Sequence, residues 1–408
     1  MALPIDPLWP RAGDWPAWHA DSSFPDAVIV GAPAWRTSLS PTGAHETPAA
    51  VREALRRFSP TLLGPPPLDL NEVLRIADAG DVEEPDGPDG EHRLRTRIAE
   101  LADAALVIAL GGDNSVTYAA AQGAGATGLI TIDAHFDLRD GVSNGSPVRR
   151  LIEDGLDPRR IVQLGIADFA NSAAYARRAA ELGITVITLD QLSRRGMDDV
   201  VAEALDVAGG DRIHLDIDID VCDRSVAPGC PASVPGGLAA WELRALVRSL
   251  AVDPRVRSAD IVEVDATADA ADGRTVRLAA LCVLELLTGV AGRPRVAAPS
   301  TAGEGSAAGA PVAGESGEAS AAEAGGGEDG AGSGDAEAGG AEGAAVGSGA
   351  AVVSGAADSG AGSGAEFAAG WAPPSSPAAD ASAPAWTPPA APIAVSDGAP
   401  HPTARETP

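Results

Sequence analysis

Short apolar runs alternate with amphipathic stretches along the first 295 residues. Continuous apolar runs are typical of strands buried in a parallel sheet, and strands separated by helices are typical of a sheet covered on both faces. The expected strands include 28–30, 106–110, 128–132, 161–165 and 185–189, and the expected helices include 49–57, 91–103, 172–182 and 240–250. We therefore predict a three-layer α/β/α fold with a mainly parallel central sheet, formed by one domain over residues 1–295.

The pattern changes after residue 295. Residues 296–408 are rich in Gly, Ala, Ser, Pro and Glu, and their apolar positions show neither a strand nor a helix period. Such a segment cannot offset its ordering entropy by burial, so we predict a disordered acidic tail. Its aromatic residues Phe367, Trp371 and Trp386 are compatible either with a docking motif or with no specific role.

A first group of metal-binding residue types follows the apolar run 128–132. Asp133, His135 and Asp137 recur at a spacing of two, which on a strand places all three side chains on one face. Open α/β sheets bind ligands at the carboxyl ends of their strands. Two carboxylates and an imidazole are costly to bury there unless a cation neutralises them, although a solvated or salt-bridged strand end is the alternative.

A second group lies about eighty residues later, where Asp216, Asp218 and Asp220 alternate with apolar residues. Three like charges at this spacing repel one another unless something positive holds them. Two such groups in one chain favour a two-metal hydrolytic site, in which carboxylates bridge ions about 3.5–4 Å apart and a shared water is activated.

Four stretches together carry a family resemblance: Gly111–Ser115, Asp133–Asp137, Asp218–Asp223 with Ala227–Gly229, and Glu263–Asp265. In this order they resemble the ureohydrolase superfamily of arginase, agmatinase and formimidoylglutamase, over residues 27–293. The resemblance implies an arginase-like fold, two Mn²⁺ ions, hydrolysis of a small guanidino or formimino compound, and a homo-oligomer, either a trimer or a hexamer.

The resemblance also implies a ligand set. Asp133 and Asp218 correspond to bridging carboxylates, His135 and Asp220 to ligands of one manganese, and Asp137 to a ligand of the other. Asp216 takes the place of a small polar residue, which implies either an acid hydrogen-bonded beside the site or a further ligand.

Asn114 departs from the family pattern, because relatives usually have histidine in its place. An Asn side chain offers a neutral amide oxygen, which binds manganese more weakly than imidazole does. Three outcomes stay open: two ions of which one is labile, a single ion, or a degenerate site.

The loop 136–150 resembles that of formimidoylglutamases, since Asn144 stands where arginases and agmatinases generally carry histidine. This implies hydrolysis of N-formimino-L-glutamate to L-glutamate and formamide, a step of histidine degradation. The alternatives are a guanidino ureohydrolase that releases urea, and a non-catalytic family member.

Candidate roles for residues around the metals follow from the implied substrate. Arg139 and Asn144 are expected to bind it, and Arg139, Arg149 and Arg150 are cations suited to its carboxylates, although surface ion pairing is the other interpretation. Glu263 is expected to pair with the cationic nitrogen of the substrate, or alternatively to form a salt bridge. Asp220 is expected to pass a proton to the leaving amine.

Charge and composition restrict the remaining possibilities. The net charge of −29 argues against a nucleic-acid partner. The first ten residues lack the pattern of a signal peptide, and no apolar run is long enough to cross a membrane, so a cytoplasmic protein is expected. The cysteines, Cys222, Cys230 and Cys282, are odd in number and are expected to be free and buried rather than paired or zinc-bound.

Overall fold

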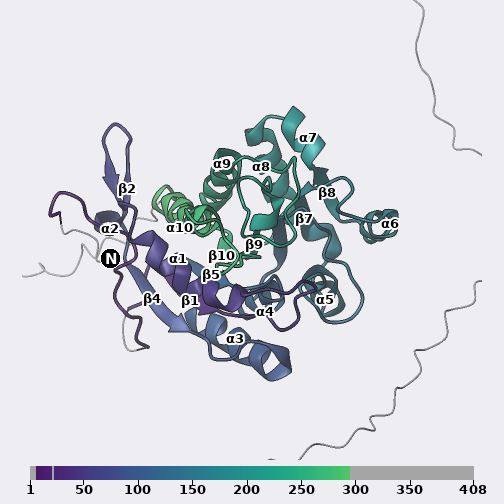
Figure 1. The fold of residues 1–408 in the computed structure, drawn as a ribbon, viewed down its shortest axis with the longest axis horizontal. Coiled ribbons are helices and arrows are strands. Elements are labelled where there is room, and N and C mark those ends of the chain that lie inside the picture. The colour runs from purple at the N-terminus through teal and green to yellow at the C-terminus, as the bar shows by residue number, and fades with distance from the viewer. Residues whose placement is uncertain (1–5, 21–22, 295–408) are drawn as a thin grey trace, which may run out of the picture. The chain divides into compact units, whose positions relative to one another are not determined.

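The sheet of the protein contains eight strands, in the order β4-β1-β5-β10-β9-β6-β7-β8, and every neighbouring pair is parallel (Figure 1). The computed structural model describes residues 6–20 and 23–294, all of which belong to one compact unit. The strands are β1 (Ala27–Ala32), β4 (Ile76–Asp81), β5 (Leu106–Gly111), β6 (Gly128–Ile132), β7 (Ile161–Ile166), β8 (Thr185–Thr188), β9 (Ile213–Asp218) and β10 (Val256–Val262).

Helices cover both faces of this sheet. One face packs against α1 (Thr47–Leu55), α2 (Leu70–Val73), α7 (Leu189–Arg194), α8 (Met197–Ala208), α9 (Ala240–Ala251) and α10 (Arg274–Ala291). The other packs against α3 (Gly87–Leu101), α4 (Val116–Gly123), α5 (Pro147–Glu153) and α6 (Ala173–Leu182). The predicted three-layer α/β/α fold is therefore confirmed, whereas the predicted tail lies outside the described residues.

Helix boundaries follow local signals. Ser172 caps α6 by accepting a hydrogen bond from the Tyr175 backbone N–H, and Gly183 ends the helix with a φ of +80°, a conformation that glycine adopts without strain. The expected helix 91–103 instead begins at Gly87, because Pro88 is well placed in a first helical turn.

Two features were not expected from the sequence. β4 forms an edge of the sheet, where its Asp78 and Asp81 pair with Arg52 of α1. A separate antiparallel pair, β2 (Thr61–Leu62) and β3 (Leu68–Asp69), precedes it.

The four stretches that carry the family resemblance follow four adjacent strands in the middle of the sheet. In space these are β5, β10, β9 and β6. Because the strands are parallel, their carboxyl ends meet at one edge, and the motifs from distant parts of the chain converge there. Within residues 6–20 and 23–294, no helix is both long enough and apolar enough to span a bilayer.

Candidate metal and substrate site

The first metal-binding group lies beyond its strand. β6 ends at Ile132, so the prediction that Asp133, His135 and Asp137 share a strand face is wrong. The chain turns instead: the Asp133 carboxylate accepts a hydrogen bond of 2.6 Å from the His135 backbone N–H. Asp137 has a φ of +53°, which is unusual for a residue with a side chain. The side chains of Asp133, His135 and Asp137 are therefore positioned by an irregular segment and not by the alternation of a strand.

The second group is also divided between two conformations. Asp216 and Asp218 share a face of β9, but Asp220 lies in the short 3₁₀ helix Ile219–Val221 and not on the strand, which corrects the prediction. The Asp220 backbone N–H donates to the Asp218 carboxylate at 2.8 Å, which stabilises this turn. The turn directs Asp220 toward the loop after β6.

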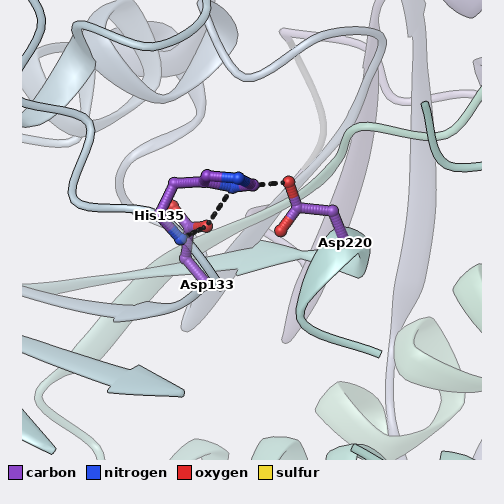
Figure 2. A group of neighbouring side chains, drawn as sticks. All are labelled: Asp133, His135 and Asp220. Carbon is purple, nitrogen blue, oxygen red and sulfur yellow. Dashed lines mark hydrogen bonds and ion pairs between the residues drawn. The ribbon is translucent and has the colours of Figure 1, made fainter. Parts of the chain in front are cut away.

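Asp133, His135 and Asp220 meet at this point (Figure 2). His135 Nδ1 lies 2.9 Å from an Asp220 carboxylate oxygen and 3.5 Å from an Asp133 oxygen. One potential ligand atom from each residue lies within 4.8 Å of the other two. Burial opposes the charged imidazole, but the adjacent Asp220 and Asp133 carboxylates outweigh it and raise the pKa of His135 to about 12.

Asn114 lies beside Asp137. Its amide N–H donates to the Asp137 carboxylate at 2.5 Å, and its amide oxygen accepts from the Thr117 hydroxyl at 2.5 Å. Because a hydroxyl both donates and accepts, Thr117 is satisfied in either orientation of the amide, including one that presents the oxygen toward Asp137 and a metal ion. Ligation by Asn114 stays a prediction.

The buried carboxylates have the properties expected of metal ligands. Burial, followed by repulsion from neighbouring acids, raises the pKa of Asp133 to about 6 and the pKa values of Asp137 and Asp218 well above normal. Among the described residues, Asp133 Oδ2 has no hydrogen-bond partner although it is fully buried. Carboxylate oxygens with one imidazole form a donor set that suits Mn²⁺. The residues present therefore fit a divalent metal site.

Glu263 follows the end of β10 and is 5% exposed. Its Oε1 accepts hydrogen bonds from the Asn114 backbone N–H and from Asn144 Nδ2, both at 2.8 Å. Burial, and secondarily the Asp113 carboxylate, raise the pKa of Glu263 to about 8. No described residue bonds to Oε2, so one oxygen is fixed and the other is available.

A cavity of about 340 Å³ unites most of the predicted site residues. Its walls include Asn114, His135, Asp137, Arg139, Asn144, Asp218, Asp220 and Glu263. Asp133 is fully buried and contacts this group through His135. The structure thus brings together the six proposed metal ligands with Arg139, Asn144 and Glu263.

The three candidate arginines are separated by their contacts. Arg150 makes two bonds of 2.7 Å to Glu91 and stacks on the Tyr118 ring, and Arg149 bonds to Glu153 and to two backbone carbonyls. Arg139 lines the cavity, and no other described residue bonds to its guanidinium. Of the three, only Arg139 is placed and free to receive a carboxylate of a ligand.

Gly145 leaves room for the side chain of Arg139. A Cβ on Gly145 would lie 2.7 Å from Arg139 Cδ and 3.1 Å from its Nε, closer than unbonded atoms normally approach. The glycine of the loop motif therefore has a direct packing role.

Two contributions to the site were not predicted. Asn171 joins the loops after β6 and β7, since it accepts from the Phe136 backbone N–H and donates to the Ala134 carbonyl. The loop 37–40, whose Leu39 and Ser40 line the cavity, is called the mouth loop. It contacts Asn144 twice: the Leu39 backbone N–H donates to the Asn144 side chain at 3.0 Å, and the Asn144 backbone N–H donates to the Thr37 carbonyl. Asn171 begins the stretch Asn171–Tyr175, which also resembles formimidoylglutamases, whereas the mouth loop carried no such signal.

The cysteines agree with the sequence-based expectation. Cys222, Cys230 and Cys282 are all free and buried. Cys230 donates to the Glu263 carbonyl through its thiol, so it supports the backbone of the site.

The fold and the site define a class of α/β proteins with a carboxylate-rich, metal-binding group of side chains at the carboxyl ends of a parallel sheet. A sequence profile of the arginase family matches residues 25–289. The chain belongs to the arginase family.

Several similar proteins are formimidoylglutamases. The formimidoylglutamase of Bacillus subtilis is 36% identical over 277 residues, which cover 64% of this chain and 86% of the relative. That of Halobacterium salinarum is 37% identical over 285 residues, which cover 66% and 90% respectively.

Solved structures agree with the sequence matches. The crystal structure of the Bacillus subtilis formimidoylglutamase superposes with a TM-score of 0.66 at 32% identity, covering 72% of this chain and 96% of that one. The Trypanosoma cruzi formiminoglutamase, described with Mn²⁺, gives a TM-score of 0.61 at 25% identity, covering 66% and 94%.

Proposed function

We propose that the protein is a manganese-dependent hydrolase that converts N-formimino-L-glutamate and water to L-glutamate and formamide. The observation that carries this proposal is the cavity, whose lining combines a buried metal-binding group with the guanidinium of Arg139, to which no other described residue bonds. The named activity of the relatives supports it. This substrate implies a cytoplasmic role in histidine degradation.

Asp133, Asp137, Asp218, Asp220 and His135 would hold two Mn²⁺ ions, the second more weakly if Asn114 is its remaining ligand. When bound, manganese would lower the pKa of a coordinated water and neutralise the buried carboxylates.

The side chains of this protein then orient the substrate. Oε1 of Glu263 is fixed by two donors, which leaves Oε2 to pair with the cationic amidine nitrogen. Arg139 pairs with a substrate carboxylate. Water adds to the amidine carbon and gives up a proton to Asp220, the bond from that carbon to the glutamate nitrogen breaks, and Asp220 passes this proton to the leaving amine.

The domain assignment is part of the proposal: residues 1–295 form the catalytic domain, and residues 296–408 form a tail that the reaction does not use. A trimer or hexamer of this domain is also proposed. Light scattering coupled to size-exclusion chromatography measures the assembly directly.

The deciding assay follows formamide release from formimino-glutamate with and without added manganese, together with urea release from agmatine, arginine and guanidino acids. We expect manganese-dependent formamide release. Urea release from a guanidino compound at higher efficiency would identify the alternative ureohydrolase. Absence of turnover, with no metal bound after reconstitution, would identify a non-catalytic member.

Arg139→Ala and Arg139→Lys test the substrate assignment. Lysine cannot reproduce a two-pronged contact with a carboxylate, so both changes should raise KM, Ala more than Lys. Loss of such a pair costs about 2–5 kcal/mol, which corresponds to about 30-fold or more in kcat/KM. Arg150→Lys is the matched control, since Arg150 is already paired with Glu91. Unchanged kinetics in Arg139→Ala would refute the assigned substrate while leaving the metal site in place.

A further inference from the structure

A row of buried oxygen atoms crosses the sheet one layer beneath the metal-binding group. It is formed by Gln163 on β7, Thr131 on β6, Asp216 on β9 and Asp260 on β10, all of them 0% exposed. Thr131 is paired with both Gln163 and Asp216, and Asp216 is paired with Asp260. Paired residues of adjacent parallel strands, about 4.8 Å apart, present their side chains to the same face. The four side chains therefore lie next to one another.

The oxygens of this row have almost no donors. Within the described residues, Thr131 Oγ1, Gln163 Oε1, Asp260 Oδ1 and both carboxylate oxygens of Asp216 have no hydrogen-bond partner. Native proteins pair nearly all of their buried polar groups, and an unpaired buried carboxylate is especially costly. A fully buried Asp216 with two unpaired oxygens therefore requires a positive partner or a proton.

The charges of the neighbouring groups do not balance. His214 is the basic group of the cluster: its Nε2 lies 3.1 Å from Asp260 Oδ2, and its Nδ1 lies 2.8 Å from Ser258 Oγ. The ion pairs within the described part of the chain include none between an arginine and Asp216 or Asp260. Even with a charged His214, two carboxylates leave one negative charge uncompensated.

Within the described residues, the groups above and below the row add no net positive charge. On the side of the metal-binding group, the acids that act on Asp216 are Asp133 and Asp137. The other side of the row faces the layer that contains α4, which packs against β10 and whose Ala119, Ala120 and Ala121 are buried. Alanine supplies neither charge nor hydrogen bonds.

We propose that Thr131, Asp216 and Asp260 bind a monovalent cation, Na⁺ or K⁺, at a site separate from the manganese group. Carboxylate and hydroxyl oxygens are the hard donors that such ions prefer, and a single charge balances the single excess. Gln163 Oε1, next to Thr131, supplies a further oxygen at the edge of the site. The site stabilises the fold and does not depend on the proposed reaction.

The first test measures the thermal unfolding midpoint of the full-length, manganese-loaded protein in KCl, in NaCl and in choline chloride at constant ionic strength. We expect a saturable rise in K⁺ or Na⁺, by about 5 °C at saturation, over the value in choline. The difference between the KCl and NaCl arms identifies the preferred ion. Equal midpoints in all three salts would overturn the proposal and leave a proton shared by Asp216 and Asp260.

The second test uses variants and elemental analysis. Asp216→Ser should abolish the cation-dependent rise. For the milder Thr131→Val, the cation concentration that gives half of the rise should be at least about tenfold higher than for the parent. Glu285→Gln is the matched control: Glu285 is a buried acid paired with Arg244 and Arg248, so its loss should lower stability but preserve the cation response.

Exchange into RbCl followed by elemental analysis should show one rubidium per chain in the parent and none in Asp216→Ser, with equal manganese in both. If Asp216→Ser loses manganese but keeps the cation response, Asp216 is a manganese ligand and the proposal is wrong. Since none of these measurements follows turnover, failure of the proposed hydrolase activity would not affect them.

Discussion

Replacing Asn144 by alanine should reduce catalysis through Glu263, without removing a metal ligand. The Asn144 side chain donates to Glu263 Oε1 at 2.8 Å and accepts from the Leu39 backbone N–H at 3.0 Å. These contacts give Asn144 a positioning role, since they join the mouth loop to the proposed substrate-binding carboxylate, and direct binding of substrate by Asn144 stays a prediction. Asn144→Ala removes one of the two donors that fix Oε1.

The size of the effect follows from burial. Glu263 is 5% exposed, so water cannot fully replace the lost donor. A hydrogen bond to a charged group contributes about 1.5–3 kcal/mol, which corresponds to a loss of about 10- to 150-fold in kcat/KM. The donor also favours the charged carboxylate, so its removal should raise the pKa of Glu263. The rising limb of the pH profile of kcat/KM should then move to higher pH.

Asn144→Asp is the matched variant, because it keeps an acceptor for Leu39 N–H but replaces the donor to Glu263 with a negative charge. We expect it to be less active than Asn144→Ala, with manganese content equal to the parent in both. Formamide release over a pH series measures the kinetics. Activity of Asn144→Ala within twofold of the parent, or full activity of Asn144→Asp, would refute the role assigned to the Glu263 contact.

Three further predictions concern metal, tail and pH. Asn114→His should tighten binding of one manganese, since imidazole is the stronger ligand. If calorimetric titration shows unchanged affinities, Asn114 is not part of the metal site. Truncation after Arg295 should leave the unfolding midpoint and kcat/KM nearly unchanged, whereas a large loss of stability would reveal a docked tail segment. In metal-free protein, the folded-state pKa of Asp133 is about 6, above its unfolded value, so stability should rise as pH falls from about 6 to 4. Chelator should accordingly lower the unfolding midpoint more at pH 8 than at pH 5, and an equal effect at both would contradict the assignment.

The inner strands β1, β5 and β6 were predictable because burial on both faces leaves a nearly continuous apolar run in the sequence. β5 and β6 agree with their expected ranges to within one residue. β4 was missed for the opposite reason: at the sheet edge its sequence is Ile-Ala-Asp-Ala-Gly-Asp, and its acids are accommodated by Arg52. An edge strand stabilised by ion pairs leaves no apolar pattern.

The identity of the site residues could be predicted, but their backbone conformation could not. Alternation placed Asp133, His135 and Asp137 on a strand, although β6 ends before them. That end depends on contacts from distant residues, such as the bonds from Asn171 to the Ala134 carbonyl and the Phe136 N–H. The choice of Arg139 over Arg149 and Arg150 depended likewise on long-range partners, including Glu91. Such contacts between distant residues cannot be predicted from the local sequence.

The residues that line the cavity come from two kinds of structure, and this bears on how substrate preference can change. The metal-binding residues follow strand ends and are buried next to one another, so most changes there should destroy function. The other lining residues, which include Leu39, Ser40, Arg139 and Gly145, lie on irregular segments. Libraries confined to these loop positions should therefore yield enzymes with new acid or amine selectivity while the hydrolytic chemistry persists. Gene duplication followed by drift at the same few positions is a correspondingly short evolutionary route between members that differ in substrate.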